Sequence, residues 1–169
     1  MERARAQHRA GFTLIEALLA ATILAMGVAA ITMPFTVGAQ NEQVDARHTM
    51  ALCLAQEMME EILSRPFNDP DGGDRTPGPE PGETPRSGFD NIDDYHGYTE
   101  AAGNVRSRDG RLLTDAAVAN LSRRVTVAYV YVQGQDVRQA PTFVRVTVEV
   151  LYRNRPTVTL TRLACELRG

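Results

Sequence analysis

Lysine is absent from this sequence, and all 18 of its basic residues are arginine, which we attribute to the base composition of the genome. Histidine is scarce: His8, His48 and His96 lie far apart, and none has metal-ligand spacing to another histidine or to a cysteine. The sequence also lacks a CxxC motif, a GxSxG motif and a glycine-rich phosphate loop. These absences argue against the common hydrolytic and redox enzymes, so we expect no enzymatic activity.

Charge is nearly absent from residues 12–37, where Glu16 is the only ionisable side chain. As a helix, this run would span roughly 39 Å, which is more than the hydrocarbon core of a membrane at about 30 Å. Residues 1–11 hold three arginines and one acid, whereas Glu42 and Asp45 precede any basic residue after the run. By the positive-inside rule, we expect a cytoplasmic leader, one membrane span and an extracytoplasmic remainder.

The basic leader and the apolar run meet in the sequence Gly11-Phe12-Thr13-Leu14-Ile15-Glu16. These six residues resemble the processing site of type IV pilins and type II secretion pseudopilins. The resemblance implies that a prepilin peptidase cuts after Gly11 and that the new amino terminus, Phe12, is methylated. It also implies that Glu16 pairs with the terminal amine of a neighbouring subunit in a filament. The partners implied are the peptidase, other pilin-like subunits, an inner-membrane assembly platform and membrane lipid.

An ordinary secretory signal peptide is the alternative interpretation of the same segment. Val28-Ala29-Ala30 offers small residues for a cleavage site that would leave Ile31 as the new amino terminus. Against this alternative, the apolar run is longer than the usual 7–15 residues and contains a charge. We therefore favour the pilin-like interpretation.

The apolar run has two further features of a packed membrane helix. Small residues recur every fourth position, a spacing that lets membrane helices approach closely, at Ala17, Ala21, Ala25 and Ala29. Gly27 and Pro34 are predicted helix breakers, and proline removes a backbone donor, so we expect a kink or local unwinding near Pro34.

Beyond Gln40 the helical period continues with a more polar composition. Apolar positions step by three and four from Val44 to Ile62, which predicts an amphipathic helix that ends at Arg65-Pro66. The run from Leu54 to Leu63 resembles the corresponding helix of minor pseudopilins and of minor pilins such as those of the mannose-sensitive haemagglutinin (MSHA) pilus.

Residues 66–100 are rich in proline, glycine and acidic side chains. No apolar residue lies between Phe67 and Phe89, so we expect a mobile surface loop that nothing anchors to a core. From Phe89 to Tyr98 aromatic and apolar residues recur every third position, which predicts a docked turn or short 3₁₀ segment. Two acidic groups, neither of which matches an EF-hand, could bind calcium: Asp69, Asp71 and Asp74, or Asp90, Asp93 and Asp94.

Three β-branched runs joined by short turns follow, at residues 121–132, 143–152 and 157–163, and predict an antiparallel meander. The simplest fold that buries both apolar surfaces is α+β, in which the inward face of this sheet covers the apolar positions of the long helix from Val44 to Ile62. A disulfide between Cys53 and Cys165 would require the last strand to pack on the helix, and two buried thiols are the alternative. The expected segments are a cleaved leader at 1–11, a membrane half-helix at 12–37, an amphipathic half-helix at 38–65, a loop at 66–100 and a sheet at 101–169.

The sequence therefore predicts a minor pilin or pseudopilin, held first in the bacterial inner membrane and then in a periplasmic or surface filament. The same scaffold has two alternative functions: an adhesive subunit at a filament tip, or a solitary membrane-anchored domain. No basic stripe indicates a nucleic-acid partner, and no cofactor other than calcium is indicated.

Overall fold

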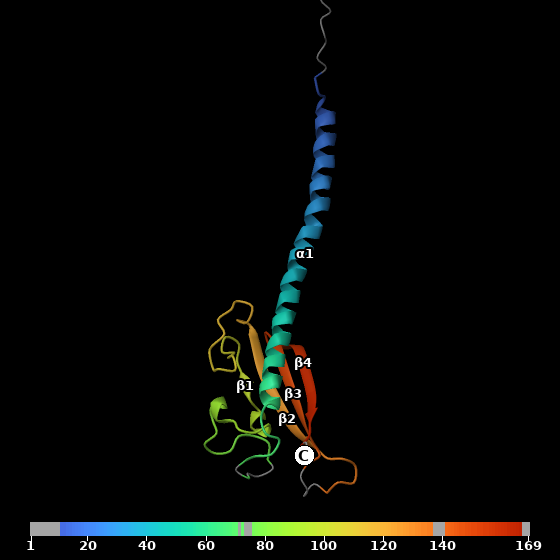
Figure 1. The fold of residues 1–169 in the computed structure, drawn as a ribbon. Helices are drawn as coiled ribbons and strands as arrows, with labels where there is room; N and C mark the ends of the chain where they lie inside the picture. Colours follow the sequence, from blue (N-terminus) through green and yellow to red (C-terminus); the bar gives the residue numbers. More distant parts are fainter. Residues whose placement is uncertain (1–10, 71, 73–75, 137–140, 167–169) are drawn as a thin grey trace, which may run out of the picture. The chain divides into compact units, whose positions relative to one another are not determined.

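The computed structural model describes residues 11–70, 72, 76–136 and 141–166. One long helix, α1, runs from Leu14 to Leu63 and is followed by short 3₁₀ segments and a four-stranded sheet (Figure 1). The chain divides into two compact units, residues 1–44 and residues 45–169, and α1 contributes to both. The α+β fold class predicted from the sequence is confirmed.

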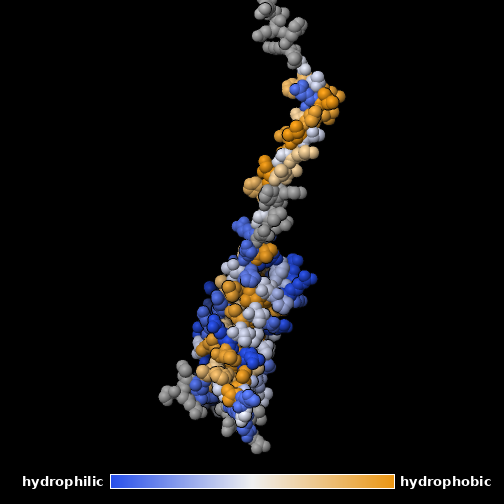
Figure 2. All heavy atoms as spheres, turned by 90° about the vertical axis from the view of Figure 1, so that its right-hand side faces the viewer, coloured by the Kyte–Doolittle hydropathy of each residue, from blue (hydrophilic) through white to orange (hydrophobic). Residues whose placement is uncertain are grey.

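The first unit consists of the amino-terminal part of α1, whose described side chains are exposed. Figure 2 shows a largely hydrophobic surface along this part of the helix. α1 is continuous through Gly27 and Pro34, so the local unwinding that was one of the two expectations at Pro34 does not occur, and the other, a kink, stays a prediction. Helical neighbours on both sides of the proline maintain the helix although one backbone donor is missing. The breaker role of these two residues in a filament stays a prediction.

In the second unit, α1 buries one side of its last turns. The buried residues follow the steps of three and four that an amphipathic helix requires: Ala51, Leu54, Ala55, Met58, Met59 and Ile62. Val44 and His48 are exposed, so the buried stripe begins later than the predicted Val44. α1 ends just before Arg65 and Pro66, as predicted.

The sheet is antiparallel throughout, in the order β1-β2-β3-β4. Its strands are β1 (Thr99–Glu100), β2 (Leu121–Val130), β3 (Phe143–Tyr152) and β4 (Arg155–Ala164). The three long strands confirm the predicted meander. β1 is an addition, because the sequence pattern places residues 99 and 100 in the loop whereas they pair with Arg124 and Arg123.

The connection between β3 and β4 is a two-residue turn with positive φ at Arg153 (49°) and Asn154 (64°). Such a turn matches the twist of antiparallel strands. Pro156 lies within β4, on the edge of the sheet and beside a register shift at Val150 and Leu151. An edge strand accommodates a proline because the lost N–H need not bond a neighbour.

A single hydrophobic core joins the buried stripe of α1 to one face of the sheet. The sheet contributes mostly valine, at Val125, Val127, Val144, Val146, Val148, Val150 and Val158. The predicted packing of sheet on amphipathic helix is thereby confirmed.

The segment from Phe89 to Tyr98 contains the predicted 3₁₀ turn, η2 (Asp93–Tyr95); another of equal length, η1 (Arg86–Gly88), precedes the segment. Phe89 and Tyr95 are buried with ring centroids 5.0 Å apart in an edge-to-face arrangement. These aromatic side chains join the segment to the core.

Candidate processing and assembly site

The amino-terminal motif of the sequence lies at the start of α1. Gly11, Phe12 and Thr13 precede the helix, and the Phe12 side chain is 80% exposed. Thr13 occupies the cap position, because its Oγ1 accepts a hydrogen bond from the Glu16 N–H at 3.3 Å. The carbonyl of Thr13 accepts from the Ala17 N–H at 3.1 Å. Threonine followed three residues later by glutamate is the capping-box spacing, which fixes the helix start two residues after Phe12.

Glu16 lies in the first turn of α1 and is exposed. A negative side chain there interacts favourably with the partial positive charge of the helix amino terminus. Among the residues that the structure describes, none pairs with the Glu16 carboxylate through a hydrogen bond or an ion pair. The predicted role of Glu16 requires such a free carboxylate, and its pairing with a neighbouring amine stays a prediction.

The helix that carries Glu16 is apolar over a membrane-spanning length. Leu14–Thr32 has a mean hydropathy of 2.3, and none of it is buried within the chain. By length and composition this segment is able to cross a membrane, and a signal sequence near an amino terminus has the same properties. The four alanines of the predicted small-residue face are all exposed and therefore accessible to another helix.

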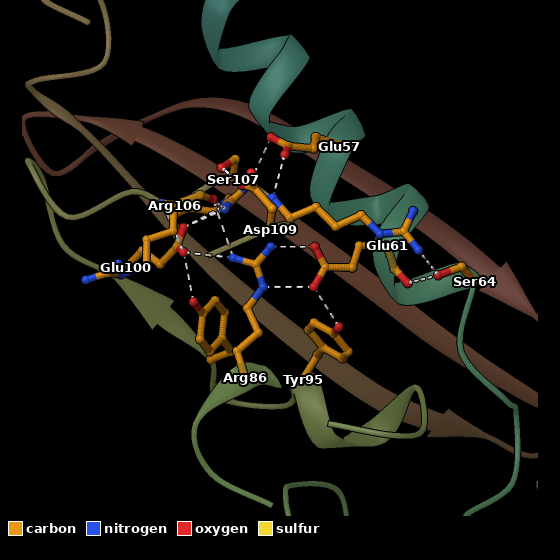
Figure 3. A network of polar contacts seen from close by, with 12 residues as sticks. Glu57, Glu61, Ser64, Arg86, Tyr95, Glu100, Arg106, Ser107 and Asp109 are labelled. Atoms are coloured by element: carbon orange, nitrogen blue, oxygen red, sulfur yellow. Dashed lines mark hydrogen bonds and ion pairs between the residues drawn. The ribbon is translucent and has the colours of Figure 1, made fainter. Parts of the chain in front are cut away.

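The second unit contains a group of buried and half-buried charged side chains that the sequence pattern does not predict (Figure 3). Arg86 lies between two carboxylates: its Nε donates to Glu61 Oε1 at 2.8 Å, and its Nη1 donates to Glu100 Oε1 at 3.0 Å. Its Nη2 also pairs with Glu61. Tyr95 donates its hydroxyl to Glu61 Oε1 at 2.8 Å. These contacts attach residue 86 to α1, which corrects the expectation that nothing anchors the loop.

A second buried arginine completes this ion network, which we define as Glu61, Arg86, Glu100 and Arg123. The Arg123 side chain is fully buried and donates from Nε to Glu100 Oε2 at 2.8 Å. Its Nη1 donates to the carbonyl of Leu54 at 3.0 Å and its Nη2 to that of Arg106 at 2.8 Å. Two positive and two negative side chains therefore compensate each other inside the protein, as buried charges require.

The electrostatic environment of the network favours its charged form. Burial opposes ionisation of Glu61, but hydrogen bonds from Arg86 and Tyr95 outweigh it, so the pKa of the carboxyl is lowered. Burial also opposes the charge on Arg86, but its bonds to Glu61 raise the guanidinium pKa. Burial, together with the neighbouring Glu61, raises the pKa of Tyr95 to about 12. The network therefore favours its charged form, and it joins α1, the loop and β2.

One signal in the sequence could have indicated this network. Arg123 alternates with Leu121 and Val125, which are both buried, so the strand pattern places a charge on the inward face. A buried arginine needs an acidic partner, and the sequence alone does not select Glu100 among the acidic residues of the loop.

The predicted calcium residues do not form one group. Asp71 and Asp74 lie outside the described residues, and Asp69 is half-buried. Asp93 accepts a hydrogen bond from the Tyr129 hydroxyl. Asp94 is fully buried, and its Oδ2 accepts from the backbone of Asp90 and Asn91, so it shapes the turn.

The two cysteines are both free and exposed. Neither expected arrangement, the disulfide or the pair of buried thiols, occurs in the structure. Cys53 lies next to the buried stripe of α1 but points away from it, and Cys165 follows the end of β4.

The comparison with known proteins bears on the amino-terminal site. The family model described as the prokaryotic N-terminal methylation motif matches residues 7–32, which include Gly11, Phe12 and Glu16. No curated protein and no solved structure matches the chain. The motif match supports a type IV pilin-like subunit that prepilin peptidase processes, and it points to a structural protein rather than an enzyme. With the apolar helix, it fits a single-pass, membrane-anchored protein.

Proposed function

We propose that this chain is a minor pilin or pseudopilin, a structural subunit of a type IV pilus-like or type II secretion filament. Prepilin peptidase cuts after Gly11, and the amino group of Phe12 is methylated. The subunit is first held in the inner membrane. Its leader lies in the cytoplasm, and its head, which is the second unit (residues 45–169), lies outside. An assembly platform then moves it into a periplasmic or surface filament.

The observation that carries this proposal is the free carboxylate of Glu16 on an exposed apolar helix, inside the matched methylation motif. A charge near the centre of a bilayer costs about 2.5–3.5 kcal/mol, and less near an interface. Removal of the leader creates a positive amine on Phe12, four residues before Glu16. Pairing of Glu16 with the amine of a neighbour compensates both charges within the membrane.

The pairing also gives the filament its register. A buried charge pair acts mainly by selecting one arrangement over others, because displaced partners leave two charges uncompensated. Helices that carry one acid near their amino terminus should therefore lock at a single axial stagger. The exposed alanine face, Ala17 to Ala29, allows the close helix approach that such pairing needs.

The assignment as a minor subunit rests on the segment Leu54–Leu63, which resembles the corresponding helix of minor pilins and minor pseudopilins. In this structure the segment supplies five of the buried residues of α1: Leu54, Ala55, Met58, Met59 and Ile62. It therefore joins the helix to the head.

The proposal is tested with Glu16→Leu and Glu16→Gln in cells that assemble the filament. We expect both variants to insert into the membrane at least as well as the native chain, because a costly charge is gone. We expect incorporation into filaments, measured by co-purification and cross-linking with neighbouring subunits, to fall strongly. Glu42→Gln is the matched control, since Glu42 is an exposed acid of the same helix outside the apolar span. Normal incorporation of the Glu16 variants would refute the pairing.

Mass spectrometry of the mature protein tests the processing step separately. We expect methylated Phe12 as the first residue. An amino terminus at Ile31 would instead show cleavage of a secretory signal peptide after Ala30.

A further inference from the structure

Three carboxyl groups of the second unit converge in one place. Glu80, Glu83 and Asp94 each contribute a carboxylate oxygen to a group whose members all lie within 4.8 Å of one another. Glu80 and Glu83 precede η1, whereas Asp94 lies in η2. The backbone at Glu83 is tightly packed, because a Cβ on Gly88 would lie only 2.2 Å from the Glu83 carbonyl oxygen. We call these three residues the carboxylate cluster.

The cluster contains buried oxygens that lack a donor. Asp94 is fully buried, and only its Oδ2 is bonded, to the N–H groups of Asp90 (2.8 Å) and Asn91 (3.0 Å). Within the described part of the chain, Asp94 Oδ1 and Glu80 Oε2 are buried and have no hydrogen-bond partner. Glu83 Oε2 accepts from the Glu80 N–H at 2.7 Å. The carboxylates thus face one another although each is only an acceptor when ionised.

This arrangement is unfavourable for three ionised groups alone. The hydrogen bond with Glu83, followed by burial, raises the pKa of Glu80 to about 7. Burial raises the pKa of Asp94, and the nearby Glu83 adds to the shift. An acidic group of this kind is relieved by protons or by a bound cation. A divalent cation would compensate the converging carboxylates without a proton on any of them.

We propose that Glu80, Glu83 and Asp94 form a binding site for a divalent cation of the calcium type. The donors are all hard oxygens, which suit Ca²⁺ or Mg²⁺ and are poor ligands for metals that prefer nitrogen or sulfur. Calcium is favoured because it accepts irregular geometry and completes its shell with water, whereas Mg²⁺ demands a nearly ideal octahedron. Only Asp94 belongs to the acidic groups expected from the sequence.

The site has a structural consequence. A cation held by Glu80 and Glu83 on one side and Asp94 on the other ties the loop to η2. Arg86, three residues after Glu83, already attaches the loop to Glu61 on α1. The cation would therefore be a second anchor for the same segment, independent of the hydrophobic core.

The test is the thermal unfolding of the full chain in detergent micelles at pH 8, with 5 mM CaCl2 or with EDTA. For a Kd of about 0.1–1 mM, calcium should raise Tm by roughly 2–9 °C. Binding is measured independently by the ability of Ca²⁺ to displace Tb³⁺, whose emission is excited through tyrosine, since the chain has no tryptophan.

Glu80→Gln is the decisive variant, because Glu80 Oε2 has no hydrogen-bond partner among the described residues, and glutamine keeps the size of the side chain while removing its charge. We expect it to weaken calcium binding about tenfold or more. Asp94→Asn should do the same but also perturbs the turn. Glu60→Gln, an exposed acid of α1, is the control and should keep the full calcium effect.

Two results would overturn the proposal. One is a Tm and a Tb³⁺ signal that do not respond to calcium in the native chain. The other is an equal calcium response in the native chain and in Glu80→Gln, which would place the binding elsewhere. Neither result depends on filament assembly, so the cation site and the proposed function are tested separately.

Discussion

Replacement of Arg86 by alanine should destabilise the second unit strongly, because Arg86 is the main positive partner of a buried carboxylate. The substitution removes the donors from Nε and Nη2 to Glu61, and Tyr95 is then the remaining donor in hydrogen-bond contact with that side chain. Glu100 loses one bond but keeps Arg123. The uncompensated charge therefore falls on Glu61.

Two estimates of the cost agree. Removal of one partner from a buried ion pair typically costs about 3–5 kcal/mol. Alternatively, Glu61 takes up a proton, and protonation of a carboxyl of ordinary pKa at pH 7 costs about 3–4 kcal/mol. We therefore expect a loss of about 3–4 kcal/mol, which corresponds to a fall in Tm of roughly 6–16 °C for a chain of this size.

The assay is thermal and urea unfolding of the full chain in detergent micelles at pH 7. Arg111→Ala is the matched control, because the Arg111 side chain is 78% exposed and its one ion pair, from Nε to Asp109 Oδ2, is long at 4.0 Å. This substitution should change stability by at most about 0.5 kcal/mol. Adding Glu61→Gln to Arg86→Ala should recover part of the loss, because no buried charge is then left alone. If Arg86→Ala behaves like the control, the ion network does not anchor the loop.

Two further predictions follow from the head. The pKa of Glu61 is lowered in the folded state, so its contribution to stability is complete above the unfolded pKa near 4.5 and is lost as pH falls through the folded pKa. Glu61→Gln should accordingly be less stable than the native chain at pH 7, and the two urea midpoints should converge toward pH 3; a constant difference would contradict the assigned shift. In the β3–β4 turn, Arg153 has φ 49°, a conformation that glycine adopts more easily than other residues, so Arg153→Gly should stabilise the chain by at most about 1 kcal/mol. The control Arg155→Gly, in β4, should destabilise it. A loss of stability in Arg153→Gly would show that the turn depends on the arginine side chain.

The parts of the fold that the sequence predicted are those with a local pattern. The long helix, the three long strands and the 3₁₀ turn all follow from spacing within a short window, and Arg65-Pro66 marks the helix end. β1 has only two residues and depends on partners 23 and 25 positions away, Arg123 and Arg124, so no local pattern could reveal it. The late start of the buried stripe has a similar cause, because tertiary packing, and not periodicity, decides whether Val44 is covered.

The contacts of charged residues in the loop also depend on distant partners that no local sequence pattern reveals. None of the loop's described residues between 68 and 88 belongs to the hydrophobic core, but the conclusion that nothing anchors the loop is wrong. The anchor is polar: Arg86 meets Glu61, which is 25 positions earlier, and Glu100, which is 14 positions later. In sequence, such an arginine resembles any solvated one, and only the inward position of Arg123 in its strand indicates that charges are buried here.

Both proposals concern acidic side chains that have no positive partner among the described residues. The buried carboxylates of Glu61 and Glu100 find their positive partners within the chain, in Arg86 and Arg123. Within the described residues, Glu16 on the apolar helix and the carboxylate cluster of the second unit lack such a positive partner. Acidic groups without a positive partner in the chain are left to be compensated from outside. The chemistry of each place selects a different partner. If α1 spans a membrane as proposed, the single acid Glu16 suits one amine of a neighbouring subunit, whereas three converging acids suit a divalent cation.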